Sequence, residues 1–159
     1  MNALTRKQAA EWCRNAGVPI SESGNPEPEW LNVRFDLPSG ADERRCLVDK
    51  HLKAFKSDAR VLVWITEWGV WPSQDLMPQF IALRASVGET RGLREVPAQL
   101  VGMQNIDYLR DIVSCAVASL WDVHVFGHRG RKWVFYSHDE WGAASSAAIV
   151  EQIAAADRH

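Results

Sequence analysis

The tetrapeptide over 137–140, Ser-His-Asp-Glu, contains every residue type of a hydrolase triad. A triad needs its nucleophile, base and orienting acid to converge in space, whereas adjacent side chains of one strand or helix point in different directions. The same four letters fit the S-x-x-E capping box, in which Ser137 caps a helix start and Glu140 returns to the cap backbone. The sequence therefore predicts that Ser137 and Glu140 cap a final helix over about 138–156.

Glu67 is a carboxylate near the end of an otherwise apolar strand predicted over 61–68. Strict alternation places Glu67 on the same face as Ile65. A carboxylate in that position either meets water at the sheet edge or is partly buried, with a raised pKa or a cationic partner. A structural role is one reading. The other is a small hydrolase or metal-assisted enzyme using Glu67 with His124 or His138, which requires these groups to meet within ~3 Å or through a water or metal.

A second set of potential ligands consists of His124, His128 and His138 together with Asp122. Neutral imidazoles with a carboxylate suit zinc or iron. The spacing of these residues matches no H-E-x-x-H motif, and no pair of cysteines has C-x-x-C spacing. We therefore expect no metal and no cofactor, and the sequence designates no catalytic residue.

Tryptophan is abundant, with eight copies in 159 residues. Large aromatic side chains at strand spacing are typical of a core, but Trp71 stands beside a proline in a predicted turn. Energetic centres of protein interfaces favour Trp and Arg. A predicted hairpin tip further along the chain is basic. We therefore expect a partner-binding surface at these two places: Glu67, Trp68, Trp71, His128, Arg129, Arg131 and Lys132.

These residues leave three functional hypotheses open. The leading one is a non-enzymatic intracellular protein that binds another protein, of the toxin-neutralising (immunity) or adaptor kind. The second is the hydrolase or metal-assisted enzyme described above. The third is nucleic-acid binding through the basic hairpin over 128–132, which the net charge of −2 at pH 7 disfavours because phosphate binding needs a basic surface.

Length and composition predict a single globular domain over 1–159, with a polar linker at about 21–29. The longest apolar stretches fall far short of the ~20 residues that a membrane span needs, and no secretory signal is recognisable. The three cysteines are odd in number, which argues against a disulfide framework and favours reduced core thiols. We expect a soluble cytoplasmic protein without a membrane partner.

The apolar periodicity predicts an alternation of helices and strands. Helices separate most strands, whereas the connection within the last strand pair is too short for a crossover, so that pair must be antiparallel. We expect an α/β (α+β-like) fold: a single-layer mixed sheet of four or five strands with flanking helices, and a C-terminal β-hairpin followed by a helix. The predicted helices cover 5–16, 42–55, 73–87, 105–120 and 138–156, and the predicted strands cover 30–37, 61–68, 98–103, 123–126 and 132–136.

Three segments together resemble a group of uncharacterised small bacterial α/β proteins. They are T-E-W-G-V-W-P-S over 66–73, Trp121-Asp122, and S-H-D-E over 137–140. The resemblance extends over 61–141, about half of the chain. It implies a shared fold unit and supplies no reaction, cofactor or catalytic residue.

Overall fold

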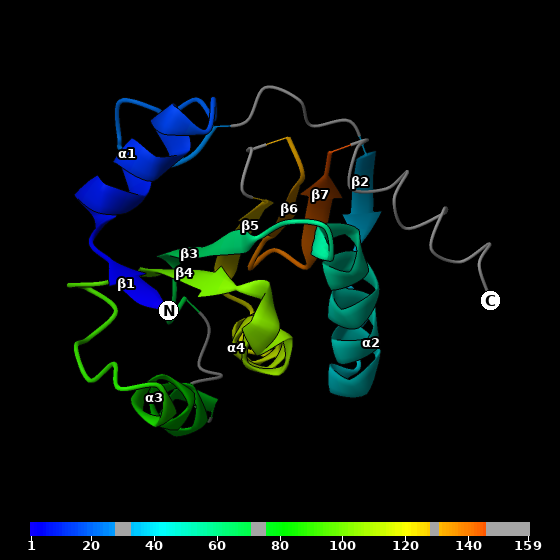
Figure 1. Ribbon diagram of the computed structural model, residues 1–159. Coiled ribbons are helices and arrows are strands. Elements are labelled where there is room, and N and C mark those ends of the chain that lie inside the picture. The colour runs from blue at the N-terminus through cyan, green and yellow to red at the C-terminus, as the bar shows by residue number, and fades with distance from the viewer. Residues whose placement is uncertain (28–32, 71–75, 128–130, 146–159) are drawn as a thin grey trace.

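The computed structural model describes residues 1–27, 33–70, 76–127 and 131–145 of the chain. Within these ranges the chain forms one sheet of seven strands in the order β1-β4-β3-β5-β6-β7-β2, together with four α-helices (Figure 1). The strands are β1 (Asn2–Leu4), β2 (Val33–Asp36), β3 (Arg60–Glu67), β4 (Ala98–Gly102), β5 (Asp122–Gly127), β6 (Trp133–Tyr136) and β7 (Trp141–Ala144). The helices are α1 (Arg6–Asn15), α2 (Ala41–Leu52), α3 (Met77–Ser86) and α4 (Ile106–Ala118).

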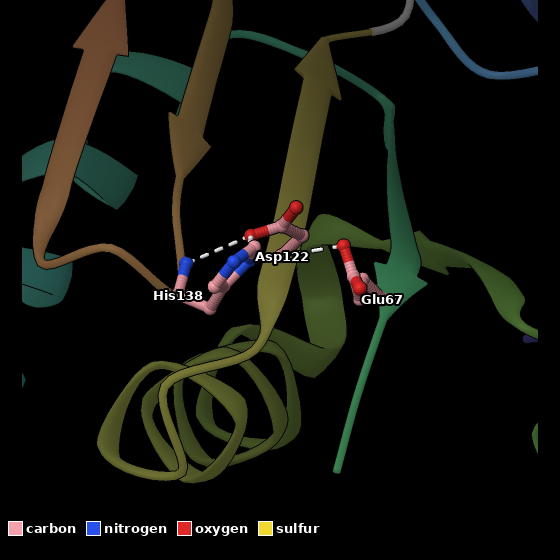
Figure 2. A group of neighbouring side chains, drawn as sticks. All are labelled: Glu67, Asp122 and His138. Carbon is pink, nitrogen blue, oxygen red and sulfur yellow. Dashed lines mark hydrogen bonds and ion pairs between the residues drawn. The ribbon is translucent and has the colours of Figure 1, made fainter. Parts of the chain in front are cut away.

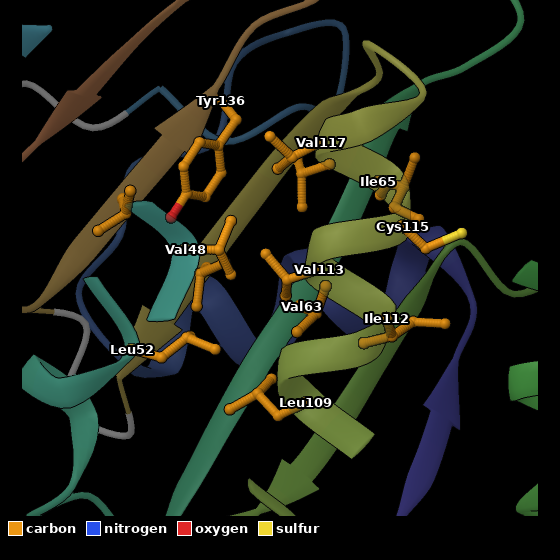
Figure 3. Packing of buried hydrophobic residues seen from close by; sticks show 14 of the residues in the cluster. Val48, Leu52, Val63, Ile65, Leu109, Ile112, Val113, Cys115, Val117 and Tyr136 are labelled. Atoms are coloured by element: carbon orange, nitrogen blue, oxygen red, sulfur yellow. The ribbon is translucent and has the colours of Figure 1, made fainter. Parts of the chain in front are cut away.

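The sheet separates two hydrophobic cores. Helices α2, α3 and α4 cover one face and α1 covers part of the other (Figure 1). In the larger core, Val48 of α2 and Val113 of α4 belong to the same buried cluster as Val63 of β3 (Figure 3). In the smaller core, α1 packs through Cys13 in a cluster that includes Trp64. Alternate residues of β3 therefore enter different cores, which explains why this strand is apolar on both faces.

Helix α1 begins as its sequence predicts. The backbone N–H of Gln8 donates to the Thr5 hydroxyl at 3.3 Å, and the Gln8 side chain accepts from the Thr5 N–H at 2.9 Å, which completes a capping box. The helix ends before Gly17, whose φ of +78° is a conformation that glycine adopts at little cost. The predicted capping box is confirmed here. The expected start of the third helix at residue 73 lies outside the described residues.

The α/β content is as expected, but the prediction of a mixed sheet with four or five strands is wrong. All neighbouring strands are antiparallel. Strands β3 and β4 are direct neighbours although α3 lies between them in the chain. A helix between two strands suggested a parallel crossover, whereas α3 leaves the sheet and the chain returns alongside the same strand. The very short strand β1 at one edge also lacked a recognisable pattern.

The prediction of a helix beginning at Ser137 is also wrong. Strands β6 and β7 form an antiparallel pair, and the backbone N–H of Ser137 donates to the Trp141 carbonyl at 2.8 Å to close the turn between them. Glu140 has a left-handed φ of 62°, and its carboxylate accepts from Arg44 at 2.9 Å. Ser137 and Glu140 thus shape a β-turn and do not cap a helix. The remainder of the predicted helix, over 146–159, lies outside the described residues.

Close packing explains why the small residues after this turn form a strand. A Cβ added to Gly142 would lie 2.3 Å from the ring of Phe35, which occupies the space that a side chain would need. Phe35 and Gly142 are register partners of β2 and β7. Because Gly142 has no side chain, the ring of Phe35 can lie directly over the backbone of β7.

No helix in the described part of the chain combines the length and the apolarity that a bilayer crossing requires.

Candidate functional site

Three side chains from distant parts of the chain converge at one end of the sheet: Glu67, Asp122 and His138, here called the acidic cluster (Figure 2). His138 Nδ1 lies 2.8 Å from Asp122 Oδ1 and 3.8 Å from Glu67 Oε2. Potential ligand atoms of all three residues lie within 4.8 Å of one another. The side chains of Asp122 and His138 are mostly buried, with 16% and 21% exposed, whereas that of Glu67 is 53% exposed. The cluster is therefore partly sheltered and reachable from solvent.

A shift of register in β3 brings Glu67 to this place. Ile65 pairs with Val123 of β5, but Glu67 pairs with Asp122, so Thr66 has no partner on β5. Such an extra residue is a β-bulge, which changes the direction of the side chains that follow it. Directly paired residues share a face, so Glu67 lies on the same side as Asp122. The expectation from strict alternation, which placed Glu67 on the face of Ile65, is wrong for this reason.

The turn between β6 and β7 brings His138 to Asp122. The carboxylate oxygen Oδ1 of Asp122 accepts from the backbone N–H of His138 at 2.7 Å and also contacts His138 Nδ1 at 2.8 Å. The backbone contact fixes the position of the residue, and the contact with Nδ1 orients the imidazole ring. The first residue of β5 thus holds the ring against the strand end, and Glu67 approaches from the neighbouring strand.

The electrostatics of the cluster favour positive charge. Burial alone would lower the pKa of His138, but the hydrogen bond to Asp122 and the negative charges of Asp122, Asp139 and Glu67 outweigh burial and raise the pKa above its ordinary value. Asp139 Oδ1 lies 3.5 Å from His138 Nε2. Three carboxylates thus surround one imidazole. Even with a protonated ring, the group keeps an excess of negative charge.

The distances suit a divalent ion. Zinc binds imidazole nitrogen and carboxylate oxygen at about 2.0–2.2 Å, so neighbouring ligand atoms of a tetrahedral site stand roughly 3.4 Å apart. The separations of 2.8 Å and 3.8 Å from His138 Nδ1 bracket this value. A proton on Nδ1 occupies the place that the ion would take. The exposed side chain of Glu67 can adjust its position more freely than the other two.

The other histidine considered with Glu67, His124, lies elsewhere. It stacks on Phe135 with ring centroids 4.5 Å apart, and its Nδ1 accepts from the indole N–H of Trp133 at 3.2 Å. Burial lowers the pKa of His124 to about 3, so the ring is neutral. Of the two partners expected for Glu67, the structure brings His138 to it and places His124 in an aromatic layer. His128 lies outside the described residues.

A cavity of ≈ 500 Å³ adjoins the acidic cluster on the sheet face that carries α1. Asp122 belongs to both the cluster and the cavity wall. Rings from three adjacent strands form the floor: His124 of β5, Trp133 and Phe135 of β6, and Trp141 of β7. Pockets of this size and mixed character are typical of small-molecule sites.

Residues 19–27 form the opposite wall of this cavity, with contributions from Pro19, Ser23, Asn25, Pro26 and Glu27. The backbone N–H of Ser21 donates to the Asn25 carbonyl at 2.9 Å, and the backbone N–H of Asn25 donates to the Ser21 hydroxyl at 3.2 Å. The first part of the predicted polar linker is therefore a hydrogen-bonded loop. The hydroxyl of Ser21 holds the backbone of this loop, whereas the side-chain oxygen Oδ1 of Asn25 is buried without a hydrogen-bond partner. Polar residues of this kind are as typical of a closed turn as of an open linker.

The predicted partner-binding residues differ in burial and in contacts, and some of them lie outside the described part of the chain. Trp68 is half-buried and packs against the larger core. Lys132 donates to Asp58 at 3.1 Å and to Ser57 at 2.6 Å, which ties the basic hairpin to the protein. Arg131 is exposed. Trp71, His128 and Arg129 lie outside the described residues, so the two surfaces stay predictions.

The cysteines follow the expectation in two of three cases. Cys13 and Cys115 are buried, and burial raises the pKa values of their thiols to about 12 and about 11. Cys46 is exposed on α2 and is not a core thiol. None of the three belongs to the acidic cluster.

Comparisons with protein-family models, with curated proteins and with solved structures each gave no match. A functional assignment therefore rests on the geometry of the acidic cluster.

Proposed function

We propose that this protein binds a divalent metal ion through Glu67, Asp122 and His138 and uses the ion in a hydrolytic reaction on a small molecule held in the adjoining cavity. The observation that carries the proposal is the convergence of these three side chains from β3, β5 and the β6–β7 turn (Figure 2). A set of one imidazole and two carboxylates is chemically suited to zinc, iron or manganese.

The charge of the cluster supports a bound cation. Glu67, Asp122 and Asp139 bring three carboxylates to a single imidazole, and the repulsion between them decreases when a divalent ion lies in their centre. Three protein ligands leave a coordination position open, which is typical of catalytic sites and not of structural ones. An ion held in this way lowers the pKa of its bound water and polarises a carbonyl or phosphoryl oxygen.

The experiment is isothermal titration calorimetry of the full chain with ZnCl₂ and with MnCl₂ at pH 7.5 and pH 6.0. We expect one site per chain and tighter binding at pH 7.5, because the ion competes with the proton of His138. Glu67→Gln and Asp122→Asn should each weaken binding about tenfold or more. Asp139→Asn is the matched control. It removes the same charge beside the same ring, at Nε2, and should change affinity by less than about threefold.

Circular dichroism without metal checks that each variant folds. Absence of binding at millimolar metal, or equal binding by Asp122→Asn and the unmodified chain, contradicts the metal site. The hydrolytic half of the proposal is tested with p-nitrophenyl acetate and p-nitrophenyl phosphate. Turnover should require the metal and be lost in Asp122→Asn. If metal binds and neither ester is cleaved faster than in buffer, the proposal of hydrolysis is wrong and only cation binding stands.

A second candidate is the non-enzymatic protein-binding role. One observation favours it: Val70, 43% exposed, follows the half-buried Trp68 and the exposed Glu67, so an apolar side chain stands in the expected partner surface. Val70→Asp should abolish recovery of a specific partner in a pull-down from the native host. Val33→Asp, at a similarly exposed valine on the edge strand β2, is the control. Unchanged recovery with Val70→Asp and with Trp71→Ala would count against this role.

A further inference from the structure

A second cavity, of ≈ 370 Å³, lies between α3 and the segment over 89–95. None of the acidic-cluster residues lines it. Its wall is mainly apolar, with Trp68, Met77, Phe80, Ile81 and Leu93 as the hydrophobic contributors. Arg84 of α3 also lines this cavity, and a charged residue is unusual in a mainly apolar wall.

Arg84 is a buried cation without a carboxylate in direct contact among the described residues. The residue is only 4% exposed, and its Nη2 donates to the Val96 carbonyl at 3.0 Å. Among the described residues, no carboxylate lies within 4.0 Å of its guanidinium. A guanidinium has five N–H donors in a planar fork, and a buried charge without a close partner is costly.

The acids nearest to this cavity do not fill that role. Glu89 is bound by Arg91, whose Nη2 and Nε donate to it at 2.6 Å and 2.9 Å. This pair holds the pKa of Glu89 down at about 2, and the charge of Arg84 contributes less to the shift. Glu89 in turn favours the charged form of Arg84 electrostatically, but its carboxylate makes its hydrogen bonds to Arg91 and not to Arg84. Glu95 accepts from the backbone N–H of Gly92. Three arginines and two glutamates line the cavity, which leaves its surroundings positive: Arg84, Arg91 and Arg94 against Glu89 and Glu95.

We propose that this cavity binds a small organic carboxylate with an apolar body. The carboxylate pairs with the guanidinium of Arg84, for which a planar two-oxygen anion is the best geometric match. The apolar body lies against Trp68, Phe80 and Leu93. The inference is independent of the metal site, since it uses none of the residues of the acidic cluster.

The experiment is calorimetric titration of the metal-free full chain with octanoate. Two further probes each lack one half of the proposed ligand: 1-octanol has no charge, and acetate has no apolar body. We expect saturable binding of octanoate. Binding should be at least about tenfold weaker for 1-octanol, which loses the charged hydrogen bonds to Arg84, and for acetate, which buries no apolar body. The tryptophan fluorescence should change during the octanoate titration, since Trp68 lines the cavity.

Two substitutions at the charged position separate charge from packing. Arg84→Met keeps the length of the side chain and removes the charge, and it should weaken octanoate binding at least about tenfold with little effect on 1-octanol. Arg84→Lys keeps the charge and should retain part of the octanoate affinity. Equal affinity of Arg84→Met and the unmodified chain for octanoate overturns the proposal, as does equal binding of octanoate and 1-octanol by the unmodified chain.

A second pair of variants keeps the test decisive if Arg84→Met does not fold. Ile81 is 57% exposed and lines the cavity, so Ile81→Glu places a negative charge at its rim at little cost to folding. Gln79→Glu is the control, because it adds the same charge to an exposed position of the same helix that does not line the cavity. Ile81→Glu should weaken octanoate binding about threefold or more relative to Gln79→Glu. Equal weakening by the two variants contradicts the assigned location.

Discussion

Two imidazoles on the same side of the sheet have opposite electrostatic surroundings. His124 lies in a layer of rings with Phe126, Trp133 and Phe135, with no carboxylate among them, and burial lowers its pKa to about 3. His138, in the acidic cluster, has a raised pKa because its carboxylate neighbours outweigh burial.

The neighbouring groups, and not the residue type, therefore decide whether a histidine is neutral or carries a proton near neutral pH. The ring of His124 is a flat aromatic body with one acceptor for Trp133 and contributes to packing. The ring of His138 holds its proton among carboxylates, and under the proposed function a metal ion competes with that proton. Both environments border the same ≈ 500 Å³ cavity, one as its floor and the other, through Asp122, at its edge.

The largest expected effect comes from removing a ring beside His124. Trp133 is 1% exposed, and Trp133→Ala should lower the free energy of unfolding by about 3–5 kcal/mol, because it opens a cavity and removes the hydrogen-bond donor to His124. Urea denaturation followed by circular dichroism measures the change. His138→Ala is the comparison and should cost less than half as much. Similar losses for the two variants would show that the two environments do not differ in packing as described.

Acid should destabilise the protein through its buried neutral histidines. Burial lowers the pKa of His51 to about 4 and that of His124 to about 3, so between pH 6.5 and about 4 the unfolded chain binds protons that the folded chain does not. Stability therefore rises with pH in this window and falls as the solution is acidified, by up to about 1.4 kcal/mol per pH unit and histidine.

The matched variant for this effect is His124→Phe, which keeps a ring and removes the titrating group. It should reduce the slope of stability against pH between 6.5 and 4 by up to about 1.4 kcal/mol per unit, whatever its stability at neutral pH. The measurement is a series of urea titrations at fixed pH values. An unchanged slope would mean that His124 is protonated in the folded protein.

The smallest expected effect concerns His138 and has the opposite sign. Because its folded pKa is raised, its contribution is fully present below pH 6.5 and is lost as the pH rises through the raised value. Asp122→Asn should lower the pKa of His138 and cost about 1 kcal/mol at pH 6. Nuclear magnetic resonance titration of the histidine ring protons reports the pKa. An unshifted His138 resonance midpoint in Asp122→Asn would contradict the assigned contact, and His124 should not titrate in either protein above pH 5.

Elements with a strong local signal were predictable from the sequence. The capping box at Thr5, the apolar segment that became β3, and the strand pair β5 and β6 all carry their own residue patterns. The segment that became β7 does not, since its alanines and the alanines that follow it favour a helix. Its conformation depends on the packing of Phe35 over Gly142, about a hundred residues away along the chain.

The candidate site was predictable in composition and not in geometry. Glu67 and His138 were recognisable as reactive types, and Asp122 stood among the potential ligands, but their meeting depends on two local irregularities. One is the unpaired Thr66 in β3, and the other is the turn that Glu140 allows with its left-handed φ. Neither irregularity has a sequence signature as distinct as a glycine in a tight turn, so strict alternation and helix capping were the natural but incorrect inferences.

The placement of β2 at the edge of the sheet has a consequence for biosynthesis. Its strand partner is β7, so residues 33–36 have no neighbouring strand until the ribosome has synthesised about a hundred further residues. At a translation rate of about 5–20 residues per second, this delay lasts roughly 5–20 s. During that time the nascent chain exposes Phe35 without the glycine backbone that it later covers, and exposed apolar surface of this kind is what chaperones bind.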